Sequence, residues 1–237
     1  MIPKVIHFCW FGKGEMSVLH RRCLDSWKRY CPDFEIKLWS EKNSDLDNDY
    51  CRAAIARKKW AFVSDWVRFD VVYRHGGIYL DTDMELIRPL DELLVGDRCI
   101  LARESAVSVN PAFIASPAGN ALLAAARDLY LHDLAPRKLF TSSPLVTVRA
   151  LEQVDVVHWE VLNNKSFFPF NPYDHDNPLN ARQFMYSDLA ESTFGIHHYG
   201  LHVSWADRGL KLVMNKIQER LGLKPHWGVS FSPFVQR

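Results

Sequence analysis

The stretch from residue 61 to residue 91 constrains the fold most, because a helical pattern, two glycines, an apolar run and two aspartates follow one another there. The helical pattern stops at the glycines, residues 76–77, since a left-handed position at a helix end costs glycine nothing. Residues 78–80 are apolar and predict a buried strand, which ends at Asp81 and Asp83. A helix that turns directly into a buried strand is typical of α/β sheets.

An Asp-x-Asp pair alone carries little information, because this chain contains several of them. They are Asp45/Asp47, Asp47/Asp49, Asp81/Asp83 and Asp174/Asp176. The first two lie in a polar stretch, residues 40–49, which predicts a solvated loop whose last Asp caps the next helix. The last lies among Asn and Pro residues that predict another loop. Only Asp81 and Asp83 directly follow a buried strand, where residues i and i+2 point to the same side.

Two carboxylates that converge at one edge of a sheet repel each other unless a cation lies between them. Oxygen ligands with no cysteine nearby suit Mg²⁺ or Mn²⁺, which proteins hold through one or two carboxylates and substrate phosphates. Asp81 and Asp83 therefore predict a metal-diphosphate site. Asp65 and Arg68, three residues apart in the preceding helix, form either an exposed ion pair or part of this site, and the neighbouring motif favours the site.

The chain length, 237 residues of which 48% are apolar, is enough for one sizeable α/β core, and one globular domain is expected. Residues 4–11 form an apolar run, Ser17 caps a helical pattern up to residue 30, and apolar residues alternate at 34–38, which together predict a strand, a helix and a strand. Further strands are predicted at residues 99–102, 107–115 and 154–159, and helices at 50–75, 120–131 and 142–153. A long irregular stretch follows from residue 163 to residue 189.

Composition excludes several classes of protein. A formal charge of +1 and a pI near 7.7 give no electrostatic footprint for nucleic acid. Five cysteines with no C-x-x-C pair argue against a disulfide framework and a zinc ribbon, so a cytoplasmic location is expected. Residues 5–11 are interrupted by His7 and lack a cleavage site, which predicts a buried strand and not a signal peptide. No apolar run approaches the roughly 20 residues of a membrane-spanning helix.

Some residues outside the central stretch have two interpretations. Trp10, at the end of the first predicted strand, is either a core residue or a platform on which a base stacks. The three histidines His197, His198 and His202 lack the spacing of a helical zinc site, because positions i, i+1 and i+5 cannot all share one face, but one of them can complete the metal coordination. Residues 207–237 carry a local charge of +4 and an apolar helical stripe, which indicates either peripheral contact with an anionic membrane or packing against the domain.

Three segments resemble a known family. IPKVIHFCWFG, SDWVRFDVVYRHGGIYLDTDMELIRPLD and HHYGLHVSW are similar to glycosyltransferase family 32, the capsular-polysaccharide sugar transferases with a DXD motif. These enzymes are distantly similar to the glucosylating domains of clostridial toxins. The resemblance covers residues 2–115 well and 195–205 loosely. It implies a single GT-A domain over residues 1–237, with a Rossmann-like mixed sheet flanked by helices. Residues 1–115 would bind the nucleotide sugar, and residues 116–237 would supply the acceptor site and a closing loop.

The resemblance also implies roles for individual residues. Trp10 would stack on the base, and Asp65 and Arg68 would hold ribose and donor-sugar hydroxyls. Asp83 would bind the metal directly, and Asp81 would contact ribose or the metal. Asn110 falls near the donor sugar in the family. His198, Ser204 and Trp205 fall in a loop that closes over the diphosphate, with His198 as a further metal ligand.

For the reaction, the resemblance implies a retaining hexosyl transfer that depends on Mn²⁺ or Mg²⁺. The expected donor is a UDP-hexose, with GDP-mannose as the other choice, and the expected acceptor is a glycan or a lipid-linked sugar. The product would be capsule, exopolysaccharide or a related surface glycan. The expected place is the cytoplasm, with peripheral contact at the inner face of the plasma membrane.

Two other functions fit an Asp-x-Asp after a strand. A phosphohydrolase of the haloacid dehalogenase type places the motif near the N-terminus, with Thr or Val two residues later, whereas Glu85 stands there in this chain. A sugar- or metal-binding module of the same fold without turnover is the second alternative, because a fold and a motif do not prove activity.

Overall fold

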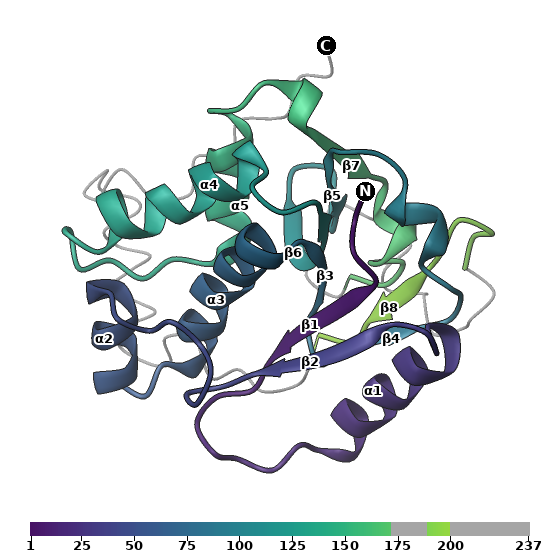
Figure 1. The fold of residues 1–237 in the computed structure, drawn as a ribbon, viewed down its shortest axis with the longest axis horizontal. Helices are drawn as coiled ribbons and strands as arrows, with labels where there is room; N and C mark the ends of the chain where they lie inside the picture. Colours follow the sequence, from purple (N-terminus) through teal and green to yellow (C-terminus); the bar gives the residue numbers. More distant parts are fainter. Residues whose placement is uncertain (172–188, 200–237) are drawn as a thin grey trace. The chain divides into compact units, whose positions relative to one another are not determined.

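The computed structural model describes residues 1–171 and 189–199, all within one compact unit, Met1–Tyr199. Its centre is a six-stranded sheet in the order β2-β1-β3-β6-β5-β7 (Figure 1). The strands are β1 (Val5–Cys9), β2 (Glu35–Trp39), β3 (Gly77–Leu80), β5 (Cys99–Arg103), β6 (Val109–Ser116) and β7 (Trp159–Leu162). β1 pairs in parallel with β2 and β3, while β6 is antiparallel to β3 and β5. The predicted mixed α/β sheet is confirmed.

Helices cover both faces of the sheet. They are α1 (Val18–Tyr30), α2 (Asp49–Ala56), α3 (Trp60–His75), α4 (Ala121–Asp128) and α5 (Ser143–Leu151). α1 lies on one face, and α2 to α5 lie on the other (Figure 1). Side chains of β1 alternate between these faces, so Phe8 meets Trp27 of α1 while His7 lies near His75 of α3. Among the described residues, no helix has the length and apolar character required to span a bilayer.

The first predicted helix is confirmed with its cap. Ser17 is the N-cap of α1, and its hydroxyl accepts the backbone N–H of His20. The buried side of α1 carries Cys23 and Trp27. The Trp27 indole donates to the carbonyl of Met84 at 2.7 Å, which fastens α1 beside the short strand β4 (Met84–Leu86).

Three sequence-based boundaries were wrong. The helix predicted over residues 50–75 is two helices, because the chain turns at Arg57–Lys59 and Lys58 takes a left-handed φ of 53°. The cap of α2 is Asn48, whose side chain accepts the N–H of Cys51 at 2.8 Å, and not Asp49. The strand predicted over residues 154–159 is a 3₁₀ turn, η3 (Val156–His158), and the strand follows it as β7.

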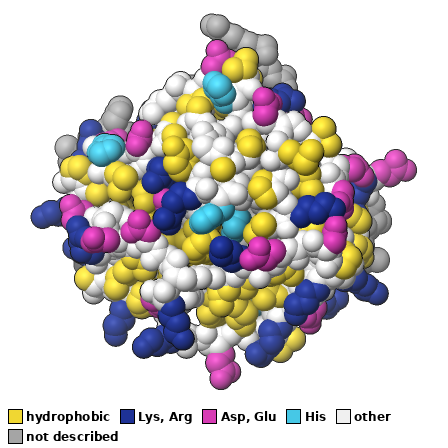
Figure 2. Space-filling view, in the orientation of Figure 1, with side chains coloured by type: hydrophobic (Ala, Val, Ile, Leu, Met, Phe, Trp, Pro, Cys, Tyr) yellow, Lys and Arg dark blue, Asp and Glu magenta, His cyan; other side chains and the backbone are white. Residues whose placement is uncertain are grey.

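Basic and acidic side chains are interspersed on the face seen in Figure 2. The hydrophobic core between the sheet and its helices includes large side chains that are almost fully buried. Examples are Trp27, Tyr79, Phe113, Phe167 and Phe168. All five cysteines are buried and free.

His7 is a buried polar residue of β1 with both ring nitrogens in use. The Trp39 indole donates to Nδ1 at 3.0 Å, so Nδ1 is the acceptor and Nε2 carries the proton that it donates to the Gly76 carbonyl at 2.8 Å. Burial lowers the pKa of His7 from 6.5 to about 4. The neutral ring therefore ties the edge strand β2 to the turn that precedes β3.

The free energy of unfolding is expected to decrease as the pH falls from 6.5 to about 4, because the unfolded chain protonates His7 while the folded chain does not. The contribution of neutral His7 to the free energy of unfolding is fully present above pH 6.5. At pH 4 the free energy of unfolding is lower by about 3 kcal/mol. Urea unfolding at several pH values measures it. His7→Gln is the control, since its amide can replace both hydrogen bonds without titrating. An identical pH slope in both proteins would rule out His7 as the cause.

Candidate active site

The two carboxylates of the central motif lie where β3 ends and β4 begins. The backbone N–H of Asp81 donates to the Ala112 carbonyl at 2.9 Å, which holds Asp81 beside β6. The N–H of Met84 donates to the Asp81 carbonyl at 2.9 Å and closes a turn that contains Asp83. β4 then pairs antiparallel with β8 (Gly195–His197), so a distant part of the chain comes next to the motif.

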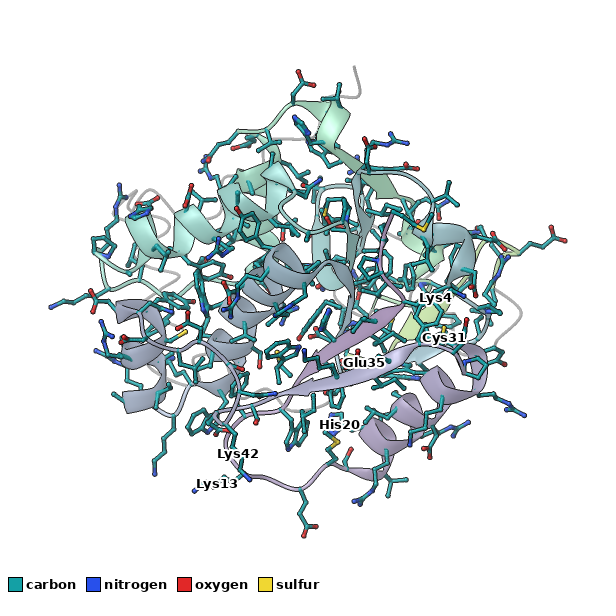
Figure 3. The ribbon with its side chains drawn as sticks, in the orientation of Figure 1. Lys4, Lys13, His20, Cys31, Glu35 and Lys42 are labelled. Atoms are coloured by element: carbon teal, nitrogen blue, oxygen red, sulfur yellow. The ribbon has the colours of Figure 1, made fainter. Side chains whose placement is uncertain are left out.

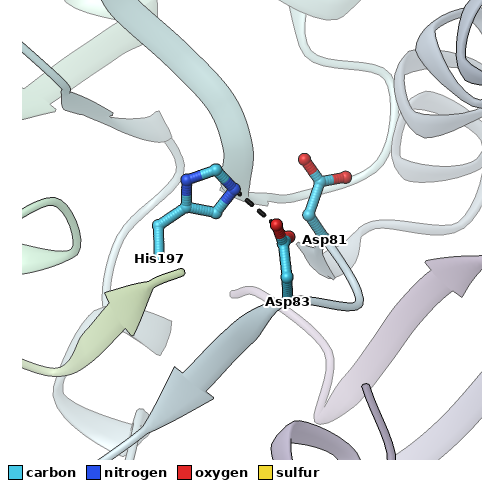
Figure 4. A group of neighbouring side chains, drawn as sticks. All are labelled: Asp81, Asp83 and His197. Carbon is cyan, nitrogen blue, oxygen red and sulfur yellow. Dashed lines mark ion pairs between the residues drawn. The ribbon is translucent and has the colours of Figure 1, made fainter. Parts of the chain in front are cut away.

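Asp81, Asp83 and His197 form a group that can hold a metal ion (Figure 4). One ligand atom from each residue lies within 4.8 Å of the other two, and His197 Nε2 is 3.2 Å from Asp83 Oδ1. Two carboxylates and an imidazole fit a divalent cation. The nitrogen ligand favours a transition metal ion such as Mn²⁺ over Mg²⁺, which takes oxygen ligands.

His197 is fixed by contacts on several sides. Its backbone N–H donates to the Phe167 carbonyl at 3.0 Å, and its ring meets Phe168 and Tyr199 edge-on. Burial lowers the pKa of His197, but the charge of Asp83 and a hydrogen bond to it outweigh burial and leave the pKa above its usual value. The ring is therefore held toward the carboxylates.

His198, the histidine that the sequence placed in the metal group, points elsewhere. Its Nε2 lies 2.8 Å from Glu85 Oε2, and its backbone N–H donates to the Asp83 carbonyl at 3.0 Å. Adjacent residues of a strand point to opposite sides, so only one of the two histidines can face Asp83. The structure brings His197 into the group and leaves His198 to hold β8 beside β4.

Arg68 of α3 connects the helix to the motif. Nη2 lies 2.8 Å from Asp65 Oδ1, and Nη1 lies 3.3 Å from Asp81 Oδ2. Nη1 also donates to the Pro111 carbonyl at 3.1 Å. The side chains of Arg68 and Asp65 are only 6% and 10% exposed, so the alternative of an exposed ion pair was wrong. The structure brings Asp65, Arg68 and Asp81 together.

The electrostatics of this cluster depend on burial. Burial raises the pKa of Asp65 to about 6, although Arg68 and a hydrogen bond with Ser143 oppose the shift. Tyr79, which sequence reasoning missed, donates its hydroxyl to Asp81 Oδ1 at 2.9 Å, and its ring lies 4.9 Å below the Arg68 guanidinium. The period of two along β3 was the available signal, because it puts Tyr79 and Asp81 on the same side.

Trp10 lies directly after β1, as predicted. Its backbone N–H donates to the Trp39 carbonyl at 2.9 Å, and its indole donates to the Gly14 carbonyl at 2.6 Å. The ring is half-buried and meets His20 edge-on at 4.9 Å between centroids. Figure 3 labels His20 at the start of α1. Trp10 is thus no fully buried core residue, and its contact with a base stays a prediction.

Asn110 lies on β6 with its amide engaged by the protein. Its Nδ2 donates to Glu104 Oε2 at 2.5 Å, and its Oδ1 accepts the N–H of Ala112 at 2.9 Å. The roles predicted for Ser204, Trp205 and the basic segment 207–237 lie outside the described residues, as does the Asp174/Asp176 pair.

Comparison with known proteins agrees with this geometry. Residues 17–100 match the family described as glycosyltransferase sugar-binding region containing DXD motif. A curated protein, inositol phosphoceramide mannosyltransferase 3 of Schizosaccharomyces pombe, is 31% identical over 101 residues, which are 39% of this chain and 27% of that protein. The chain thus spans about a quarter of the length of this relative. The resemblance to DXD sugar transferases is confirmed.

Two solved structures superpose on this chain to different degrees. The PaToxG glycosyltransferase superposes with a TM-score of 0.54 at 20% identity over 64% of this chain and 68% of that chain. A glycosyltransferase involved in glycosylation of the major capsid of PBCV-1 gives a TM-score of 0.49 at 10% identity over 84% of this chain and 95% of that chain. The first of these confirms the predicted fold class.

Proposed function

We propose that this chain, whose residues 17–100 match a DXD sugar-binding region of glycosyltransferases, is a metal-dependent glycosyltransferase that uses a nucleotide sugar. The observation that carries the proposal is the convergence of Asp81, Asp83 and His197 beside the buried Arg68. A transferase that uses a nucleotide sugar needs a cation at the diphosphate and side chains that orient the sugar at the same place. The metal group and Arg68, which share Asp81, support this function.

Each group has a place in this proposed chemistry. A bound Mn²⁺ or Mg²⁺ would act as a Lewis acid on the diphosphate leaving group. Asp83 and His197 would hold the ion, while Asp81 is shared between the ion and Arg68. Arg68 and Asp65 would bind hydroxyls of the donor, and the half-buried Trp10 would meet the base. Because these side chains are anchored by helix and strand, they need little reorganisation when charge develops.

The finer features of the reaction belong to the proposal as well. We propose a UDP-hexose as the donor, with GDP-mannose as the other choice, and transfer with retention to a glycan or a lipid-linked acceptor. The product would be capsule, exopolysaccharide or a related surface glycan. The basic segment 207–237 and a cytoplasmic location at the inner face of the plasma membrane fit such an acceptor. The arrangement of residues 1–237 as a single GT-A domain, with an acceptor part after residue 115, is proposed on the same basis.

Incubation of the purified protein with a panel of UDP- and GDP-sugars is expected to give slow hydrolysis of one donor in the presence of Mn²⁺. Water replaces the missing acceptor in this assay, so the acceptor need not be known. Release of free sugar and nucleoside diphosphate is measured with Mn²⁺, with Mg²⁺ and with EDTA.

The other candidate functions give different results in the same assay. A phosphohydrolase would release inorganic phosphate, and a binding module would bind a donor without splitting it. Absence of hydrolysis across the whole panel, with the metal bound, would contradict the proposed activity.

A further inference from the structure

Glu104, in the loop between β5 and β6, is a carboxylate held by neutral donors. Ser108 Oγ donates to its Oε1 at 2.9 Å, and Asn110 Nδ2 donates to its Oε2 at 2.5 Å. Its backbone is fixed too, because its N–H donates to the Ser108 carbonyl and its carbonyl accepts Asn171 Nδ2 at 2.9 Å. No ion pair of Glu104 occurs among residues 1–171 and 189–199.

This arrangement differs from that of an ordinary structural carboxylate. A half-buried carboxylate is stabilised most by a guanidinium or ammonium partner, which shares its charge. Hydrogen bonds from a hydroxyl and an amide instead fix the orientation of the Glu104 carboxylate, but they do not neutralise its negative charge. Each carboxylate oxygen also keeps one further acceptor site, since a carboxylate accepts about four hydrogen bonds.

The contacts of β6 place Glu104 at the candidate active site. Asn110, which holds the carboxylate, is followed by Pro111, whose carbonyl accepts Arg68 Nη1, and by Ala112, whose carbonyl accepts the N–H of Asp81. Three consecutive residues therefore connect Glu104 with Arg68 and Asp81.

We propose that Glu104 is a catalytic residue that faces the transferred sugar and stabilises the positive charge that develops at the anomeric carbon. This inference rests on the proposed glycosyltransferase function and deepens it. Glycosyl transfer proceeds through an oxocarbenium-like state, and a fixed negative charge stabilises that state more than the neutral ground state. A cation held by Asp83 and His197 would neutralise the leaving diphosphate, so the two charges of the transition state would have separate partners.

Glu104→Gln tests the assignment, because it removes the charge and keeps the size of the side chain. The donor that the wild-type protein hydrolyses fastest in the panel is the substrate, and UDP or GDP serves as the probe of binding. We expect kcat to fall roughly 100-fold, as for loss of one preorganised electrostatic contact, with KM and the nucleotide Kd unchanged. Glu160→Gln, on β7, is the matched control. Its carboxylate pairs with Arg98 at 2.7 Å, and the variant should hydrolyse the donor at the wild-type rate.

The outcomes separate this inference from the proposed function. Wild-type hydrolysis together with wild-type kcat in Glu104→Gln overturns the role of Glu104 and leaves the proposed function standing. A loss of kcat that comes with weaker nucleotide binding and a lower Tm shows a structural role and also overturns it. A wild-type protein that splits no donor overturns both. If Glu104→Gln does not fold, Ser108→Ala loosens the same carboxylate, and a lower kcat at unchanged KM supports the inference while wild-type kcat overturns it.

Discussion

Asp83→Ala is expected to abolish metal-dependent donor hydrolysis while the protein stays folded. Asp83 is the carboxylate of the metal group that lies nearest to His197, and it leads directly into β4. Its removal leaves one carboxylate and one imidazole, which is a weak ligand set for Mn²⁺. Loss of a metal ligand and of Lewis-acid assistance to the leaving group should lower the rate by at least about 100-fold.

Stability should respond differently from activity. Asp83→Ala removes the repulsion between Asp81 and Asp83 together with the 3.2 Å contact between Asp83 and His197, so the Tm of the metal-free protein should change little. Addition of Mn²⁺ should raise the Tm of the wild-type protein and not that of the variant, because only a ligand that binds the folded state shifts unfolding. Thermal unfolding and calorimetric titration with Mn²⁺ measure both effects.

The chain offers a matched control in another Asp-x-Asp pair. Asp47, in the loop before α2, is largely exposed and forms an ion pair with Arg52. Asp47→Ala should leave metal binding and hydrolysis at wild-type values. Full activity in Asp83→Ala would contradict the metal assignment, and equal losses in both variants would show that the effect is not specific to the site.

Arg68→Met is expected to lower the free energy of unfolding by about 3–5 kcal/mol, the range observed when one partner of a buried ion pair is removed. Arg68 is 6% exposed at its side chain and satisfies Asp65, Asp81 and the Pro111 carbonyl at once. Methionine fills a similar length without a charge. The loss would therefore come chiefly from Asp65, which would remain buried without its cation.

The pH dependence of this loss follows from Asp65. Its pKa in the folded protein, about 6, is above its ordinary value of 3.8, so its favourable contribution is present below pH 3.8 and is lost as the pH rises through 6. Arg68 opposes this shift, and its removal should raise the pKa of Asp65 further. Urea unfolding should therefore show a larger destabilisation of Arg68→Met at pH 8 than at pH 5.

The double variant Asp65→Asn/Arg68→Met is the control, because it removes the buried charge together with its partner. It should recover most of the stability that Arg68→Met loses, but it should not recover donor hydrolysis. A loss below about 1 kcal/mol in Arg68→Met would mean that Arg68 forms no essential buried pair. An unchanged stability in the double variant relative to Arg68→Met would assign the loss to packing.

The central motif was predictable because its signals are local. The glycine pair ends α3 with positive φ angles of 65° and 101°, and a Cβ at Gly77 would meet the Val5 carbonyl oxygen at 2.7 Å. The strand and the aspartates follow within a few residues, so spacing alone placed Asp81 and Asp83 at the sheet edge. The same holds for Ser17, whose capping role depends on residues one turn away.

Features that depend on distant partners were not predictable. The sequence does not show which residues at the short strand β8 point toward the aspartates. It therefore could not decide whether His197 or His198 joins the metal group. The burial of Arg68 depends on Pro111 and Tyr79, which come from two other elements. No Gly or Pro marks the break between α2 and α3 in the sequence. Lys58 takes the left-handed backbone conformation at this break. Tertiary contacts override helix propensity at such a place.

The pairing of β4 with β8 determines when the metal group can exist during folding. Met84 and His197 are register partners, although most of the described chain lies between them in sequence. A nascent or truncated chain that ends before β8 contains both aspartates and Arg68 but only two of the three metal-binding side chains. Contacts of such high sequence separation form late, because a long loop has to close first. Metal affinity should therefore report the completion of the fold, and not the presence of the aspartate motif.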